Sequence, residues 1–141
     1  MPQRNAEATW EGDLKSGKGS VKLGSGAFEG SYSFGSRFEG APETNPEELI
    51  GAAHAGCFSM ALSMMLAQAG FTPKRVHTVA RVSIDKVAEG FKITKIQLET
   101  EASVPGMDEK AFLEHANKAK TGCPVSQALA ATPIELKAKL I

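Results

Sequence analysis

The sequence predicts an α+β fold in which an antiparallel sheet packs on one long, buried central helix. Two observations predict it. Alternating apolar and polar residues mark strands in both halves of the chain, and an uncharged segment of helical length runs from Leu49 to Phe71. We expect the element order βββ–α–ββ–αα–β. The 141 residues hold no internal repeat and no linker-like stretch, so we expect a single domain over residues 1–141.

The first part of the chain predicts short strands separated by glycine-rich turns. Residues 6–12 alternate weakly and residues 19–24 follow a Lys/Gly turn, which indicates two strands. The glycines from Gly24 to Gly40 indicate twisted strands and loops with little core of their own. In an extended segment here, one face would carry Tyr32, Phe34 and Phe38, and the other Ser31, Ser33 and Arg37.

The central helix has a well-marked start and end. Thr44 or Asn45 can cap it, Pro46 suits its first turn, and the helix dipole favours Glu47 near this end. Gly70 is placed to terminate it. The segment is long enough to span a bilayer, but its alanines and glycines give little transfer energy and its polar residues oppose insertion. We therefore expect a helix buried on all sides by protein, with a second helix against its small side chains.

The second half of the chain predicts two strands, two helices and a final strand. The two strands lie between residues 76 and 104, and a change in the parity of their apolar positions predicts a bulge near Thr94–Lys95. Asp108 is placed to cap the next helix, and Pro124 lies in the first turn of a short one. Residues 133–141 alternate regularly, which predicts an edge-type strand.

Charge and composition exclude several function classes. The formal net charge is +0 and there is no basic stripe, so we expect neither a nucleic-acid partner nor an electrostatic membrane anchor. The first ten residues have no apolar segment of the signal-peptide type, and we therefore expect a cytoplasmic protein. In a reducing compartment, the two cysteines are more often redox-active, metal-binding or inert than a permanent disulfide.

Each cysteine has a structural and a chemical interpretation. Cys57 lies in the middle of the central helix, on one stripe with Met60 and Met64, where a cysteine often serves as a small apolar side chain. Cys123 lies at a helix start, where N–H groups and the dipole favour a thiolate, although it could simply be a turn residue. If their Cα atoms lie within about 7 Å, a reversible disulfide is possible. A metal site with His54 is disfavoured by the ligand spacing, and a core histidine fits better.

Peroxide reduction by a thiol needs a fixed cation, because a free thiol is mostly protonated at neutral pH. Arg37 is the candidate cation, unless it is a solvated strand residue. Glu47 is the candidate carboxylate partner, unless it belongs to a capping box. Cys57 follows Glu47 by about 15 Å along one helix, so the two cannot meet within a chain unless the helix breaks. A two-fold dimer, in which Glu47 and Arg37 reach Cys57 of the partner subunit, would solve this.

Several motifs together resemble the OsmC branch of the OsmC/Ohr family of thiol peroxidases. They are TNPEELIGAAHAGCFSMALSMML, GFTPKRV, FKITKIQLE, VPGMDEKAF and KAKTGCPVSQAL, with WEGDLKSGKG and SRFEG nearer the start. The resemblance covers nearly the whole chain. It implies an OsmC-like fold and an intertwined homodimer with active sites at the interface.

The resemblance also implies roles for single residues. Cys57 would be the peroxidatic thiolate and Cys123 the resolving thiol, whereas the helix dipole alone would make Cys123 the attacker. Arg37 would activate Cys57, and Glu47 would hold Arg37. Such proteins reduce organic hydroperoxides, and hydrogen peroxide less well. An external dithiol, such as a lipoyl-bearing protein, would recycle the disulfide, and no metal, haem or flavin is implied.

Apolar residues near these positions are candidates for binding the organic part of the substrate. A wall of Phe58, Met60 and Met64, with Phe38, would favour organic hydroperoxides by about 0.8 kcal/mol for each buried CH₂. Two other classes of function remain open. One is a non-enzymatic dimer that binds a lipid or other small ligand, with structural thiols, and the other is a structural dimer with inert thiols.

Overall fold

The computed structural model describes residues 1–141, which group into two compact units, Met1–Leu49 and Ile50–Ile141. Each unit contains its own three-stranded sheet. The single domain expected from the sequence stays a prediction. The predicted α+β class is confirmed, because helices and sheets alternate along the chain in nearly the predicted order.

The first unit contains an antiparallel sheet of β1 (Ala6–Glu11), β2 (Lys18–Leu23) and β3 (Glu29–Tyr32), in that order. The Trp10 and Tyr32 rings meet across β2, with centroids 5.4 Å apart. Gly19 lies between them, and a Cβ there would come within 2.5 Å of the Tyr32 ring. The aromatic contact on this sheet therefore requires a residue without a side chain on the middle strand.

A short helix, α1 (Phe34–Phe38), follows β3, so the extended segment predicted here is wrong. Ser33 and Ser36 form a capping box: the Ser33 hydroxyl accepts from the Ser36 N–H at 3.1 Å, and the Ser36 hydroxyl accepts from the Ser33 N–H at 2.8 Å. Helical spacing then brings Phe34 and Phe38 together, with ring centroids 4.9 Å apart. These local contacts outweigh the strand-like alternation of the sequence.

Helix α2 (Pro46–Gln68) has the predicted bounds. The Asn45 side chain accepts a hydrogen bond of 2.7 Å from the N–H of the third helical residue, as expected of an N-cap. Gly70 ends the helix with a positive φ of 93°. The N–H of Phe71 then bonds back to the Leu66 carbonyl at 2.9 Å, which completes a Schellman turn.

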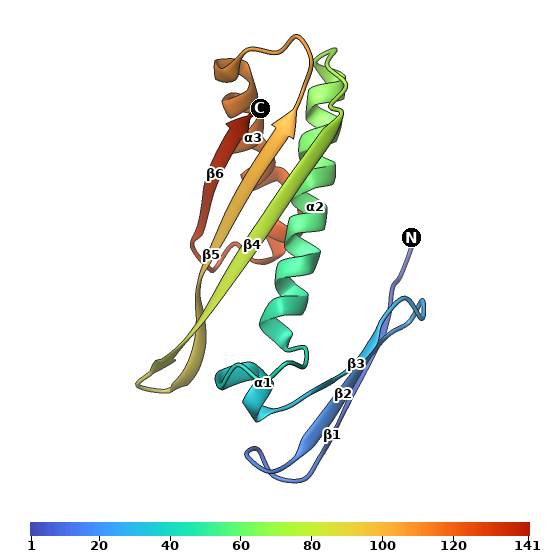
Figure 1. Ribbon diagram of the computed structural model, residues 1–141, viewed down its shortest axis with the longest axis vertical. Coiled ribbons are helices and arrows are strands. Elements are labelled where there is room, and N and C mark those ends of the chain that lie inside the picture. Colours follow the sequence, from blue (N-terminus) through green and yellow to red (C-terminus); the bar gives the residue numbers. More distant parts are fainter. The chain divides into compact units, whose positions relative to one another are not determined.

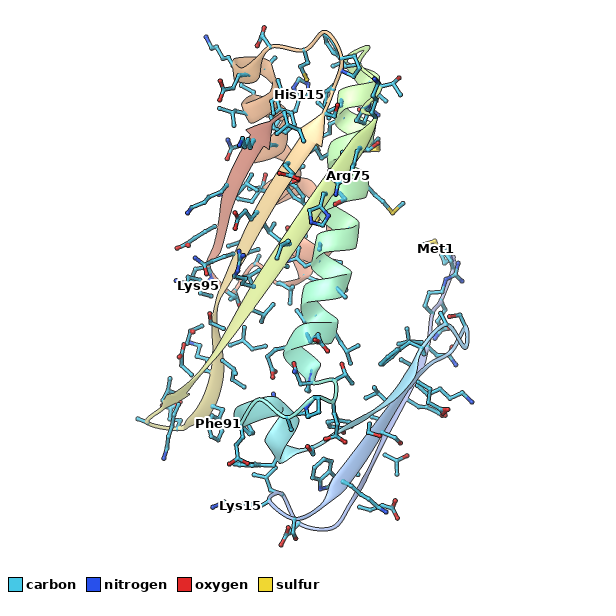
Figure 2. All side chains as sticks on the ribbon, viewed as in Figure 1. Met1, Lys15, Arg75, Phe91, Lys95 and His115 are labelled. Atoms are coloured by element: carbon cyan, nitrogen blue, oxygen red, sulfur yellow. The ribbon has the colours of Figure 1, made fainter.

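The sheet of the second unit consists of β4 (Arg75–Val87), β5 (Gly90–Ser103) and β6 (Ile134–Leu140). Strands β4 and β5 form a long antiparallel hairpin with Phe91 near its turn (Figures 1 and 2). Their register skips Thr94, which confirms the predicted bulge. Strand β6 lies at the sheet edge as predicted, but it pairs with β5 in parallel, unlike the antiparallel pairs elsewhere. Two intervening helices carry the chain back across the sheet and allow this direction.

Helices α2 and α3 (Glu109–Gly122) enclose the core with one face of this sheet, and α4 (Pro124–Ala128) follows α3 directly (Figure 1). The Asp108 side chain caps α3, as predicted. Three elements contribute fully enclosed side chains: Phe58, Leu62 and Leu66 from α2, Ile96, Leu98 and Ala102 from β5, and Phe112, Ala116 and Ala119 from α3.

Only one face of α2 is buried in the chain, in contrast to the predicted burial on all sides. The other face is uncharged and carries small residues and methionines, with Met60 76% and Met64 53% exposed. By length and composition α2 could cross a membrane, and 28% of its most apolar window is buried. An apolar helix face of this kind is typical of a surface that another structure covers.

Candidate active site

The two cysteines come together in the second unit although they lie far apart in the sequence. Cys57 lies in the middle of α2 and is half-buried, whereas Cys123 is fully buried where α3 ends and α4 begins. Both are free thiols, and their side chains are joined by a hydrogen bond. The two thiols are therefore neighbours in the reduced chain.

The first turn of α4 donates a backbone N–H to each sulfur. The N–H of Ser126 donates to Cys123 Sγ at 3.3 Å, so that Cys123 acts as the N-cap of this helix. The N–H of Val125 donates to Cys57. Pro124 fits the first helical position because it has no N–H to leave unpaired. The helix start, which the sequence linked to Cys123 alone, thus contacts both thiols.

The surroundings of Cys57 within the chain favour its neutral thiol. Burial is the main reason that the pKa of Cys57 is raised, and the hydrogen bond to Cys123 and the charge of that group add to it. The Val125 N–H acts in the opposite direction but does not outweigh burial. A Cys57 thiolate near neutral pH therefore needs a positive charge beyond these contacts.

His54 is buried beside the thiols, as predicted for a core histidine. Its Nε2 lies 2.7 Å from the Ser126 hydroxyl, which in turn accepts a hydrogen bond of 3.2 Å from Cys123 Sγ. The other ring nitrogen, Nδ1, is buried without a hydrogen-bond partner. Burial lowers the pKa of His54 and favours the neutral imidazole. No group of three or more His, Cys, Asp or Glu residues is arranged to hold a metal ion.

Arg37 and Glu47 form a bidentate ion pair in the first unit. Arg37 Nε and Nη2 donate to the two carboxylate oxygens of Glu47 at 3.0 and 2.9 Å. The arginine side chain is 36% exposed and the glutamate side chain 7%. The Asn45 side chain donates to the Ser36 carbonyl of α1 at 3.2 Å and thereby fixes α1 against the start of α2. Arg37 is consequently not a solvated strand residue.

The ion pair also decides between the two interpretations of Glu47. The capping-box position of α2 belongs to Glu48, whose N–H is bound by Asn45. Glu47 is one residue too early for that role, and its carboxylate points to Arg37 instead. Because the pair uses Nε and Nη2 of Arg37, its Nη1 remains for a further acceptor.

Aromatic side chains surround Arg37 in a pocket of about 220 Å³. Phe38 lines this pocket, and its ring centroid lies 5.4 Å from the Arg37 guanidinium carbon, while its predicted role in substrate binding stays a prediction. Sequence reasoning missed the other members, because they come from β1 and the turn after it, the end of β3, and the cap and first residue of the unpredicted helix α1. Gly19, which pairs with Trp10, was the available sequence signal, because a residue without a side chain there leaves room for an aromatic contact. The additional lining residues are Trp10, Leu14, Tyr32, Ser33 and Phe34.

The predicted apolar wall of α2 is divided between two faces of the helix. Phe58 is fully buried in the core, so its assignment to a substrate wall is wrong. Met60 and Met64 are exposed on the other face. Helical periodicity explains the difference, since Phe58 aligns with Leu62 and Leu66 rather than with the methionines.

Comparison with known proteins identifies relatives over most of the chain. Residues 38–139 match the family model described as OsmC-like protein. Peroxiredoxin OsmC of Escherichia coli (strain K12) is 58% identical over 129 residues, which cover 91% of this chain and 90% of the relative. The organic hydroperoxide resistance protein of Xanthomonas axonopodis pv. citri (strain 306) is 36% identical over 90 residues, 63% of this chain and 61% of that protein.

Solved structures show the same fold. The organic hydroperoxide resistance protein OsmC from Legionella pneumophila has a TM-score of 0.72 at 22% identity, covering 99% of this chain and 98% of that one. An organic hydroperoxide resistance protein from Elizabethkingia anophelis has a TM-score of 0.71 at 27% identity, covering 99% and 96%. An OsmC-like protein of unknown function from Vibrio cholerae has a TM-score of 0.78 at 16% identity, covering 98% and 99%.

Proposed function

Because the chain belongs to the OsmC-like protein family, we propose that it is a thiol-dependent peroxidase that reduces organic hydroperoxides, and hydrogen peroxide less well. One observation carries the proposal: two free thiols from distant parts of the sequence are in hydrogen-bond contact. The names of its relatives, a peroxiredoxin and an organic hydroperoxide resistance protein, support the reaction class.

The reaction would proceed in two steps at sulfur. The Cys57 thiolate attacks the distal oxygen of the hydroperoxide, the O–O bond breaks, and the alkoxide takes up a proton and leaves as the alcohol. Cys57 becomes a sulfenic acid. Cys123 then attacks the Cys57 sulfur, which forms the disulfide and releases water. An external dithiol, such as a lipoyl-bearing protein, reduces the disulfide by thiol–disulfide exchange.

Arg37 is proposed to supply the charge that Cys57 lacks. Burial raises the pKa of Cys57, and a guanidinium, which stays protonated, would lower it again and stabilise the leaving alkoxide. Glu47 holds the guanidinium plane through two hydrogen bonds and leaves Nη1 for the sulfur or the peroxide. The aromatic pocket beside Arg37 offers apolar surface to the organic group.

We propose further that these charged groups act on the partner subunit's Cys57 in a homodimer. Helix α2 is unbroken from Pro46 to Gln68, and its rise places Cys57 about 15 Å from Glu47 along the axis. The exposed apolar face with Met60 and Met64 suits contact with a second chain better than contact with water. In this arrangement α2 is an interface helix of a cytoplasmic protein and not a membrane span.

Thiol counting tests the reaction. One equivalent of cumene hydroperoxide added to the reduced protein should remove two thiols per chain, form the Cys57–Cys123 disulfide and yield cumyl alcohol. Dihydrolipoamide should restore both thiols. An unchanged thiol count would contradict the proposal and would favour the alternative, a non-enzymatic dimer that binds a small ligand in the aromatic pocket around Arg37 and has structural thiols.

Mixed dimers test the source of the guanidinium. Neither the Cys57→Ser nor the Arg37→Ala homodimer should be efficient. Heterodimers refolded from both combine Arg37 of one chain with Cys57 of the other, so activity should reappear if the groups act between chains. A mixture in which Arg37→Ala/Cys57→Ser replaces Cys57→Ser is the matched control and should stay at the background. Equal activity in the two mixtures would contradict action between subunits.

A further inference from the structure

His54 and Ser126 have no role in the proposed reaction, yet the structure places them in contact with the thiols. His54 lies one helical turn before Cys57 on α2 and is fully buried. Ser126 lies in the first turn of α4, where only 3% of its surface is exposed. Two polar side chains enclosed at this depth are unfavourable for stability unless they are hydrogen-bonded.

The hydrogen bonds between them have a defined direction. Cys123 Sγ–H donates to Ser126 Oγ at 3.2 Å, and the serine proton is then available for His54 Nε2 at 2.7 Å. Nε2 can accept only in the neutral imidazole that carries its proton on Nδ1. Nδ1 is the buried atom without a partner. A residue kept for packing alone would not leave a ring nitrogen unpaired, since an apolar side chain avoids that cost.

We propose that Ser126 and His54 form a proton relay that deprotonates Cys123 when it attacks oxidised Cys57, an inference that rests on the proposed function. Ser126 contacts the reacting sulfur. His54 contacts Ser126 and not the sulfur of Cys123, so it acts only through Ser126 and is a positioning residue. The relay gives each of the two thiols its own means of activation, with Arg37 of the partner subunit for Cys57 and a buried neutral base for Cys123.

The step balances without an external reagent. Cys123 passes its proton to Ser126 Oγ while Ser126 passes its own to His54 Nε2. The S–S bond forms as the S–O bond of the Cys57 sulfenic acid breaks, so that the Cys123 sulfur is oxidised and the Cys57 sulfur is reduced. The imidazolium returns its proton through Ser126 to the leaving hydroxide, which becomes water. His54 and Ser126 end in their starting states.

The electrostatic surroundings keep His54 ready to accept a proton. Burial is the cause that lowers the pKa of His54, so the imidazole is neutral at neutral pH. The titratable groups near it are Cys57, on its own helix, and Cys123, reached through Ser126. In the proposed dimer, the partner subunit's Arg37 and Glu47 would also face Cys57. The relay is therefore predicted to fail only at acidic pH, where His54 binds a proton.

Separate measurement of the two steps tests the relay. Reduced protein is mixed with cumene hydroperoxide; dimedone trapping reports the sulfenic acid, and intact mass reports the disulfide. In Ser126→Ala the ratio of the second rate to the first should fall about 10²-fold, the contribution of a positioned base. Sulfinic acid should accumulate at Cys57 at high peroxide. Ser126→Thr keeps the hydroxyl and should retain most of the ratio. Ser59→Ala removes a hydroxyl of α2 that contacts Thr78 instead of the thiols, and should not change the ratio.

A pH profile distinguishes a proton relay from a structural role. In the parent, the second step should slow as His54 becomes protonated, below the ordinary histidine range. His54→Gln keeps a polar side chain but has no base, so this acidic inflection should disappear. The ¹⁵N spectrum of the parent gives a reading that needs no variant: the relay requires the Nδ1–H tautomer of His54, and an Nε2–H tautomer would overturn it.

The outcomes separate this inference from the proposed function. If the parent forms no sulfenic acid, the proposed function fails and the relay fails with it. If sulfenic acid forms normally and Ser126→Ala closes the disulfide as fast as the parent, the relay alone is refuted. Should Ser126→Ala not fold, the His54→Gln profile and the tautomer of the parent still decide the matter.

Discussion

The ion pair of the first unit and the thiol cluster of the second unit differ in charge and in exposure to solvent. Arg37 and Glu47 form an ion pair held by two hydrogen bonds, with the guanidinium still partly open to solvent. Cys57 and Cys123 pack in or against the hydrophobic core, and their hydrogen-bond partners carry no net charge. Burial protects the sulfurs from water but raises the pKa of Cys57, which opposes its reactivity.

This difference gives a physical reason for keeping the cation apart from the buried thiols. A cation placed permanently among the core residues around Cys123 would have to be desolvated during folding of the chain, at a large cost. A guanidinium fixed by its own carboxylate on a different surface avoids this cost. In the homodimer proposed above, it would meet the partner subunit's sulfur only after assembly.

Removal of the attacking sulfur should have the largest effect. Cys57→Ser is expected to lower the rate of cumene hydroperoxide consumption by about 10³-fold or more, because the remaining thiol, Cys123, is fully buried. Cys123→Ser is the matched control. It should consume one equivalent at nearly the parent rate and then stop with oxidised Cys57. Peroxide reduction by Cys57→Ser at the parent rate would contradict the mechanism.

Changes to the ion pair should have the second-largest effect. Arg37→Lys keeps the charge but not the planar bidentate geometry, and we expect the first step to slow by about 10²-fold. The pKa of Cys57, followed by iodoacetamide alkylation against pH, should rise in this variant because burial is no longer balanced. Glu47→Gln should have a smaller effect in the same direction. An unchanged alkylation profile in both variants would show that the pair does not act on Cys57.

Loss of the α2 cap should affect stability rather than chemistry. Asn45→Ala removes the hydrogen bond to the helix start and the one to Ser36, and should lower the free energy of unfolding by about 1 kcal/mol. Asn45→Asp keeps the acceptor and should recover most of this loss. Urea denaturation measures both variants. Equal stabilities of Asn45→Ala and the parent would show that the cap is not needed.

The smallest effect should be on the pH dependence of stability. The pKa of His54 is lowered in the folded chain, so below pH of about 6.5 the unfolded chain binds a proton that the folded chain does not. The free energy of unfolding should therefore fall as pH drops from this value toward the folded pKa. His54→Phe should flatten this slope, whereas replacement of the exposed His77 by Asn should leave it unchanged. If the slope persists in His54→Phe, groups other than His54 cause the pH dependence of stability.

Much of the fold was predictable because its signals are local. The caps at Asn45 and Asp108, the turn at Gly70 and the bulge at Thr94 each depend on a few neighbouring residues. Helix α1 was missed because alternation suggested a strand, although Ser33 and Ser36 already had capping-box spacing. The parallel direction of β6 could not be read from its alternation, which is the same in either direction.

The candidate site was predictable as a set of residues but not as a set of contacts. Its four charged and thiol residues were candidates from their chemistry, and the family motifs implied a role for each. The bond between Ser126 and His54 joins elements far apart in the sequence, and no local pattern shows such a contact. The serine three residues after Cys123 was the available signal, since this is the spacing of an N-cap and the N–H that it binds.

The first turn of α4 also provides a means of observing the reaction. Because the amides of Val125 and Ser126 each bond to a different sulfur, the chemical shift of each amide proton should report the state of one thiol. Two signals in one spectrum would then follow attack, capture and reduction in turn, with no label attached to either cysteine.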